Sequence, residues 1–280
     1  MLLDDFINNC IEDELSERTL KQYKRVIKDF IDVEQVKCKE DITKLKIIDY
    51  KKHIQEQSDK IATINNKLTI INKFINYTFR DEKEEVRRSL RVELLNVQNK
   101  FEVNDVLSKI DYERLLRIAE RKGKLQLYYL METLANTGVR VSELKYITVE
   151  AVKQGETAVT NKGKTRTIYI NKYLAKDLLK YCKEENIISG IIFKSKNNKP
   201  LDNAYIYKQI QYIAGQARVK KSKAHPHSFR HLFAKTYLEE GIGDALDLSN
   251  ILGHSSLVTT RMYTTKSKKE NKRDLDKLKL

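Results

Sequence analysis

Residues that interrupt helices are scarce throughout this chain. Among its 280 residues there are only two prolines, Pro200 and Pro226, and nine glycines. Long helices can therefore form along most of the sequence. Strand signals occur in one place, residues 157–170 (TAVTNKGKTRTIYI), where two alternating stretches flank a Lys-Gly-Lys turn. The sequence thus predicts a mainly α-helical protein with one small β-hairpin.

Apolar periodicity indicates where the helices lie. One apolar face follows Ser16, a residue suited to be an N-cap, and others fall within 45–54 and 64–79. Residues 82–95 (EKEEVRRSLRVELL) are predicted as a charged helix. Further helices are expected at 112–121, 124–136, 172–185, 203–218, 227–240, 244–252 and 256–263, with a break at Gly138 and a new helix near Ser142. We expect two domains, 1–97 and 108–280, joined by a linker at 98–107.

The polar face of the predicted helix 64–79 consists of amides and lysines. Such side chains suit contacts with bases and phosphates, and they equally suit plain solvent. The sequence leaves both interpretations open for these residues: Asn65, Asn66, Lys67, Asn72, Lys73 and Asn76.

The charge balance favours a polyanionic partner. Lys and Arg number 54 against 39 Asp and Glu, a formal net charge of +15. Each phosphate contact by a basic side chain releases condensed counterions, so nucleic acid is the expected partner. A well-solvated basic surface and a membrane-surface or ribosomal protein are the alternatives.

No apolar run approaches the ~20 residues of a membrane span, so no membrane partner is expected. The odd, scattered cysteines (Cys10, Cys38 and Cys182) and the lack of a signal peptide favour a cytoplasmic protein.

Histidines gather in the last quarter of the chain. Four of the five, His225, His227, His231 and His254, fall within 30 positions. His227 and Arg230 are three apart on a helix that Pro226 can start, so both can face one site. His227 and His231 could instead mimic paired zinc ligands. The residues between them, Ser-Phe-Arg, supply no glutamate base and place a cation beside the metal. We therefore predict neither a metal nor a cofactor.

An anion site fits the charges better. The segment ANTGVRVSEL (135–144) breaks a helix at Gly138 and presents Arg140 just before the next helix. Two arginines from separate segments, Arg140 and Arg230, could hold one phosphodiester together with a histidine and neutralise the charge of its transition state. For Arg140 alone, the alternative is an ion pair with Glu143.

Phosphodiester cleavage also needs a nucleophile and an acid. Tyr263 can serve as the nucleophile, because nearby cations favour a phenolate whose pKa is ordinarily ~10. Lys162 or Lys164, at the hairpin turn, could protonate a departing 5′-hydroxyl. By itself, Tyr263 is one of 15 tyrosines, most of which must serve packing or lie on the surface.

The order of these segments resembles the tyrosine recombinase/integrase (phage integrase) family. The resemblance covers about 108–265, through TGVRVSEL, NKGKTRTIYI, HPHSFRHLFA and LGHSSLVTTRMY. The opening S-x-x-T-x-x-x-Y (Ser16, Thr19, Tyr23) is similar to the helical, SAM-like core-binding domain of the same family. The resemblance implies two lobes that form a C-shaped clamp on DNA. It also implies a two-domain member without an arm-binding domain.

The resemblance assigns roles to individual residues. Arg140 and Arg230 become the phosphate-clamping pair, and Tyr263 becomes the nucleophile. His227 becomes a proton-transfer group, and His254 lies near the scissile phosphate. The hairpin lysine becomes the general acid; the turn is about one residue shorter than the usual GKGxKxR, so Lys162 aligns best and Lys164 stays possible. Glu143 is expected to support the site, and His231 to be structural.

The implied activity is site-specific DNA recombination through a 3′-phosphotyrosyl intermediate, without metal or ATP. It would serve integration, excision or resolution, as in mobile genetic elements. The implied partners are double-stranded DNA at a specific site and further copies of the chain, four on two sites. Residues 269–280 could form a tail helix that docks on a neighbour, or a basic extension. The alternatives are a sequence-specific DNA-binding protein without catalysis and a type IB topoisomerase-like enzyme.

Overall fold

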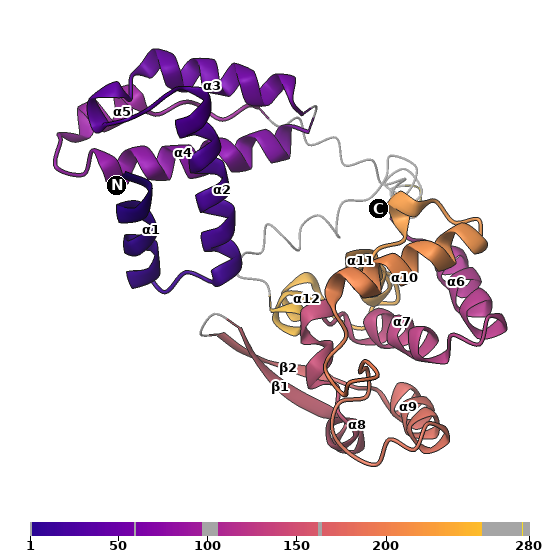
Figure 1. The fold of residues 1–280 in the computed structure, drawn as a ribbon. Coiled ribbons are helices and arrows are strands. Elements are labelled where there is room, and N and C mark those ends of the chain that lie inside the picture. Colours follow the sequence, from indigo (N-terminus) through magenta and orange to yellow (C-terminus); the bar gives the residue numbers. More distant parts are fainter. Residues whose placement is uncertain (1, 59, 97–105, 162–163, 254–275, 277–280) are drawn as a thin grey trace. The chain divides into compact units, whose positions relative to one another are not determined.

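The chain folds into two compact units. The computed structural model describes residues 2–58, 60–96, 106–161, 164–253 and 276. Residue contacts divide the chain into Met1–Lys100 and Phe101–Leu280. Both units are mainly helical, and the described strands form a single two-stranded sheet, as the sequence predicts (Figure 1). No helix within the described ranges has the length and apolar character needed to cross a membrane.

The described part of the first unit contains helices and no strand. Its elements are α1 (Leu2–Glu12), α2 (Glu17–Val33), the 3-10 helix η1 (Lys39–Asp41), α3 (Lys44–Glu56), α4 (Ile61–Thr78) and α5 (Glu84–Leu90). Helix α4 supplies much of the core through apolar side chains on more than one face: Ile64, Leu68, Ile70, Ile71, Phe74 and Ile75. Helix α1, which the periodicity did not predict, buries Phe6 and Cys10 in the same core.

The start of α2 explains the S-x-x-T-x-x-x-Y opening in physical terms. Ser16 is the N-cap, and its Oγ accepts a hydrogen bond from the Thr19 backbone N–H at 3.3 Å. The two hydroxyl oxygens lie 2.8 Å apart. One turn further on, the ring of Tyr23 stacks with that of Phe6, with centroids 6.0 Å apart. Ser16 and Thr19 therefore start α2, and Tyr23 packs this helix against α1.

The predicted helix over 82–95 is too long. Helix α5 ends at Leu90, and Arg91 is extended (φ −61°, ψ 145°). Residues 91–96, which we call the strap, contain neither helix nor strand. Side chains of α4 hold the strap from one side: Asn72 donates to Val92 O at 2.9 Å and accepts from Val92 N at 3.0 Å. Asn65 makes the same pair of bonds with Leu95, each 2.8 Å long.

The spacing of these asparagines matches an extended chain. Seven residues span about 10.5 Å along a helix, and three extended residues, from Val92 to Leu95, span about 10 Å. Two lysines of α3 also bind the strap: Lys51 donates to Glu93 O at 2.7 Å, and Lys44 donates to Arg91 O. The strap thus leaves the helical conformation because tertiary partners satisfy its backbone. Asn65 and Asn72 thus each use one donor and one acceptor of the side-chain amide to bind the backbone of the chain itself.

Replacing Asn72 by alanine is expected to lower the free energy of unfolding of the first unit by about 2 kcal/mol. Two part-buried backbone groups of Val92 lose their partners, at about 1–3 kcal/mol for each unsatisfied group. Urea unfolding of the full chain, followed by circular dichroism, measures the change. The matched control is Asn66→Ala, because Asn66 accepts an exposed hydrogen bond from Gln22 and should change stability by less than about 0.5 kcal/mol. Equal effects would mean that the strap is not held through Asn72.

The second unit packs helices around one small antiparallel hairpin. Its elements are α6 (Lys109–Arg121), α7 (Leu125–Thr137), η3 (Val141–Tyr146), α8 (Val149–Gln154), β1 (Glu156–Asn161), β2 (Lys164–Tyr169), α9 (Lys172–Glu184), α10 (Asn203–Gln216), η4 (Lys221–Lys223), α11 (Pro226–Glu239) and α12 (Ala245–Leu252). Glu156 pairs with Tyr169 at one end of the hairpin and Asn161 with Lys164 at the other. Helix α11 packs on α7, and α12 packs against β2 (Figure 1).

Most predicted helices of this unit lie where the apolar periodicity indicated. Helix α7 ends at Thr137 and is capped by Gly138, as predicted. The helix expected near Ser142 is a 3-10 helix, Val141–Tyr146, and α8 was not predicted. The helix expected at 256–263 lies outside the described residues, and so does the one expected at 269–280 apart from residue 276.

Candidate active site

The turn after α7 brings three helices together. Gly138 adopts a left-handed conformation (φ 61°) and closes α7. A Cβ at this position would lie 2.6 Å from Phe233 Cδ1 and 2.7 Å from Leu252 Cδ2. Only glycine therefore allows α11 and α12 to approach the turn so closely. Arg140 lies two residues after Gly138 and is the N-cap of η3.

Glu143 holds Arg140 in two ways. Its Oε2 accepts from the Arg140 backbone N–H at 2.9 Å, and its Oε1 accepts from Arg140 Nη1 at 3.0 Å. A second arginine, Arg166 of β2, donates from Nη2 to Oε2 at 2.6 Å. Glu143 is only 3% exposed. Its burial alone would raise the pKa of this carboxyl, but the Arg140 backbone hydrogen bond and the charges of both arginines outweigh burial and lower it. Glu143 is thus a buried carboxylate that orients two guanidinium groups.

Arg230 is buried at the centre of the same cluster. It lies on α11, which starts with Pro226, and it is 1% exposed. Its Nη1 donates to Gly138 O and its Nη2 to Leu252 O, each at 2.6 Å. Arg230 therefore joins the turn after α7 to the end of α12. The structure brings Arg140 and Arg230 together, although 90 residues separate them in sequence.

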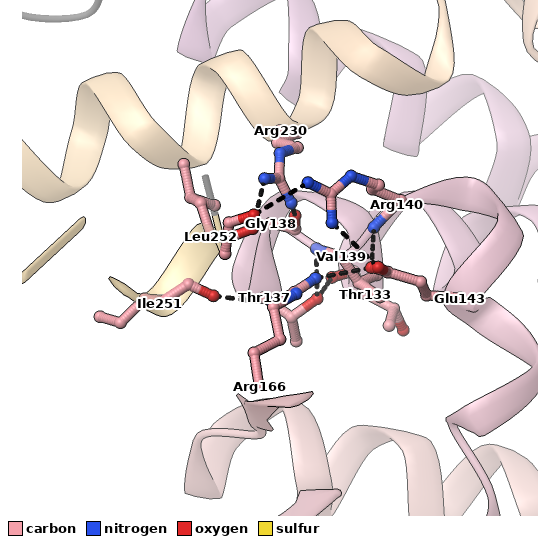
Figure 2. Close-up of polar contacts among 11 residues, drawn as sticks. Thr133, Thr137, Gly138, Val139, Arg140, Glu143, Arg166, Arg230, Ile251 and Leu252 are labelled. Carbon is pink, nitrogen blue, oxygen red and sulfur yellow. Dashed lines mark hydrogen bonds and ion pairs between the residues drawn. The ribbon is translucent and has the colours of Figure 1, made fainter. Parts of the chain in front are cut away.

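Three arginines converge on the C-terminal end of α12. Arg166 Nη1 donates to Ile251 O at 2.7 Å, Arg230 to Leu252 O, and Arg140 Nη2 to Gly253 O at 3.3 Å. Figure 2 shows the guanidinium groups arriving from separate elements. The last carbonyls of a helix lack internal partners and carry the negative end of its dipole, so cations satisfy them well. Three guanidinium groups against one carboxylate leave an excess of positive charge here, which suits an anionic ligand.

His227 lies one turn before Arg230 on α11. Its ring contacts that of His231 edge-on, with centroids 4.8 Å apart. Part of its surface stays exposed. Loss of hydration lowers its pKa from 6.5, and the positive charges of Arg230, His225 and Arg140 lower it further. The ring is therefore neutral at neutral pH and can accept a proton. No cluster of three or more His, Cys, Asp or Glu able to hold a metal occurs among the residues described.

Acidification is expected to destabilise the protein through His227. Because its pKa is lower in the folded chain than in the unfolded chain, the unfolded state takes up the proton first as the pH falls below about 6.5. The thermal midpoint of the wild-type chain should therefore fall more steeply through this range than that of His227→Gln. Calorimetry at a series of pH values measures both. An equal or steeper fall in the variant would contradict the lowered pKa.

The remaining predicted site residues, Lys162, His254 and Tyr263, lie outside the described residues. Described ranges end at Asn161, immediately before Lys162, and at Gly253, immediately before His254. The backbone of Lys164 pairs with Asn161 next to the hairpin turn, and α12 closes at Gly253 (φ 62°), the residue before His254. The arginine cluster thus lies at the point from which the chain continues to His254 and Tyr263.

The sequence motifs assign no role to Arg166, although the structure places it in the cluster. A signal was present in the sequence. Side chains alternate along a strand, and Arg166 shares its register with Ile168 and Ile170, which are 1% and 5% exposed. An arginine in the inward register of a strand must have buried partners, because an unpaired buried charge is costly.

Comparisons with known proteins agree with this architecture. The sequence matches the phage integrase family over residues 105–270 and the phage integrase N-terminal SAM-like domain over residues 2–85. The XerD tyrosine recombinases of Oceanobacillus iheyensis and Staphylococcus aureus (strain Mu50 / ATCC 700699) are each 26% identical to the chain. The alignments cover 94% and 93% of this chain and 92% of each relative.

Solved structures share the fold. The Tn1549 transposon integrase in complex with transposon right end DNA has a TM-score of 0.76 at 17% identity, over 98% of both chains. A lambda integrase dimer bound to a core site has a TM-score of 0.74 at 20% identity, over 94% of both chains. With a family model matched over more than half of its length, the chain belongs to the phage integrase family.

Proposed function

We propose that this protein is a site-specific DNA recombinase that cuts and rejoins strands through Tyr263. The phenol oxygen of Tyr263 attacks a phosphodiester, the bond from phosphorus to the 5′-oxygen breaks, and a 3′-phosphotyrosyl link forms. Attack by the 5′-hydroxyl of another strand reverses these steps and completes exchange. The covalent link preserves the phosphoester energy, so ATP is not consumed.

The observation that carries this proposal is the convergence of Arg140 and Arg230 at the end of α12. Their guanidinium groups meet on consecutive carbonyls, Leu252 O and Gly253 O, ten to eleven residues before Tyr263. Fixed positive charges at this point would stabilise the extra negative charge of a pentavalent phosphorus, and they need no reorganisation during the reaction. The excess of cations would also favour the phenolate of an attacking tyrosine.

The other site residues complete the acid–base chemistry. His227 is proposed as a proton-transfer group, and its lowered pKa supports a neutral ring able to take a proton. Lys162 is proposed to protonate the departing 5′-oxygen, with Lys164 as the alternative. His254 is proposed to contact the scissile phosphate. None of these steps requires a metal.

The DNA is proposed to be held by both domains, residues 1–97 and 108–280, joined by the linker 98–107. A net charge of +15 supports a duplex as the partner, because phosphate neutralisation releases counterions. The Tn1549 and lambda integrase structures with a similar fold contain DNA. Exchange between two duplexes requires two cleaved sites, so we propose four copies of the chain on two sites.

Covalent trapping tests the proposed function. Duplexes that bind the full chain are first selected from a randomised pool, and the enriched sequence is prepared with a nick at successive positions. Cleavage next to a nick releases a short 5′-hydroxyl fragment, which prevents rejoining. The expected result, without added metal or ATP, is a protein–DNA adduct that resists SDS and disappears on protease treatment.

Failure to form the adduct on any nicked duplex would contradict the proposal. A second measurement distinguishes a recombinase from a type IB topoisomerase-like enzyme. The recombinase should join the trapped strand to a second duplex only when that duplex carries the selected sequence. Relaxation of supercoiled plasmids without the sequence would indicate the topoisomerase activity instead.

A further inference from the structure

We propose that Arg166 is a positioning residue of this site, which fixes Arg140 and the end of α12 relative to each other. The inference rests on the proposed function and adds a residue to its machinery. Arg166 lies on β2, in pair with Val159 of β1. Its side chain is 10% exposed, so solvent and bound DNA have little access to it. Both terminal nitrogens donate to groups of the protein, and its role is proposed to pass through those groups.

Arg166 joins two segments that carry other site residues. Nη2 donates to Glu143 Oε2 at 2.6 Å, and Glu143 is the carboxylate that holds Arg140. Nη1 donates to Ile251 O at 2.7 Å, two residues before Gly253. The two short bonds leave from the two ends of one planar fork (Figure 2). The distance between Glu143 and the end of α12 is thus set by the fixed geometry of a guanidinium group.

A second, independent observation shows how closely Arg166 fits α12. Gly253 has a φ of 62°, and a Cβ on it would lie 2.4 Å from Arg166 Cδ and 3.2 Å from Arg166 Nε. The aliphatic stem of Arg166 therefore passes over the C-terminal turn of α12 where only glycine leaves room. Packing and hydrogen bonding both fix the turn from which the chain continues to His254 and Tyr263.

Lysine cannot replace this arginine. Its single ammonium group is a point charge on a flexible stem, so it can neutralise Glu143 but cannot bridge to Ile251 O in the same fixed geometry. Arg166→Lys therefore keeps the charge of the cluster and removes the bridge. We expect the rate of adduct formation on the selected nicked duplex to fall by about tenfold to a hundredfold, as misplacing a reacting group by about 1 Å does.

The matched control is Arg87→Lys in the first unit. Arg87 also bridges a glutamate and a backbone carbonyl, since Nε donates to Glu84 Oε2 and Nη1 to Arg80 O, both at 2.9 Å. This variant should form adduct at the wild-type rate. All rates are divided by the fraction of DNA bound, so that a partly unfolded variant does not register as slow. Duplex affinity should stay within about twofold for both variants, because neither arginine is proposed to touch DNA.

A substrate with sulfur in place of the 5′-bridging oxygen identifies which step fails. A thiolate leaves without protonation, so this substrate restores activity when the general acid is missing. Because Arg166 is proposed to act through Arg140 and α12, the Arg166→Lys defect should persist on it, whereas a variant of the general-acid lysine should recover. Recovery of Arg166→Lys would overturn the inference and place its effect on the hairpin lysine.

The two proposals fail in different ways. Absence of adduct with the wild-type chain contradicts the proposed function and the role of Arg166 with it. A wild-type chain that forms adduct, beside an Arg166→Lys chain that forms it equally fast, contradicts only the positioning role. A loss shared equally by Arg166→Lys and Arg87→Lys would also overturn it, because the effect would then not be specific to the site.

Discussion

A chain in which phenylalanine replaces Tyr263 is expected to form no covalent adduct with DNA. Phenylalanine keeps the ring and its packing but lacks the oxygen that would bond to phosphorus, so the proposed first step cannot occur. Selected nicked duplexes and SDS gels measure the adduct. Affinity for the intact duplex should stay within about twofold, because a single hydroxyl contributes little to a contact that is mainly with phosphates.

The control for this experiment is Tyr212→Phe. Tyr212 lies on α10, is 49% exposed, and has no proposed role in the site. It should give the wild-type yield of adduct. An undiminished adduct with Tyr263→Phe would show that another residue is the nucleophile, and peptide mapping of the adduct would then identify which of the 15 tyrosines, or which other side chain, is linked to DNA.

Replacing Arg230 by alanine is expected to lower the rate of adduct formation by at least about a hundredfold, the loss typical when one preorganised donor to a transition state is removed. The structure adds a second effect. Arg230 donates to Gly138 O and Leu252 O, so alanine leaves two buried carbonyls without these donors. The free energy of unfolding should fall by about 2–5 kcal/mol, from the carbonyls and the cavity together.

Arg230→Lys separates the two effects. Lysine refills part of the space and keeps a charge, so it should recover more stability than activity. Thermal unfolding, duplex affinity and the adduct rate per bound chain are compared for both variants. The control is Arg121→Ala, which removes the same charge from an exposed position at the end of α6. A parallel loss of DNA binding and cleavage in Arg230→Ala would mean that Arg230 only anchors the backbone of the duplex.

The local features of this fold were predictable because their causes are local. Ser16 caps α2 by a bond to a residue three positions away. Gly138 ends α7 because a left-handed residue closes a helix, and two stretches of alternating residues form the paired strands β1 and β2. In each case a few consecutive residues contain the whole physical explanation.

The strap shows where local reasoning fails. The charged run 82–95 has a helical composition, and Glu84 does pair with arginines on following turns. Its second half is nevertheless not helical, because Asn65 and Asn72 bind its backbone from 20 to 30 positions away. The same asparagines were open to interpretation as DNA contacts. Only the position of the strap in space shows that each of these amides binds a backbone N–H and a backbone C=O of the chain.

The site divides in the same way. The sequence alone determined the class of chemistry: the charge of +15 indicated a polyanion, and Arg140, HPHSFR and LGH before Tyr263 indicated a phosphodiester site. Residue type and residue order carry these signals, so they can be recognised without a structure. Only the tertiary structure decided that Arg140, Arg166 and Arg230 donate to three consecutive carbonyls at the C-terminal end of α12, those of Ile251, Leu252 and its C-cap Gly253, and that Glu143 links two of these arginines. Hydrogen bonds act over about 3 Å whatever the sequence separation, so a cluster built from four distant segments can be observed only after the chain has folded.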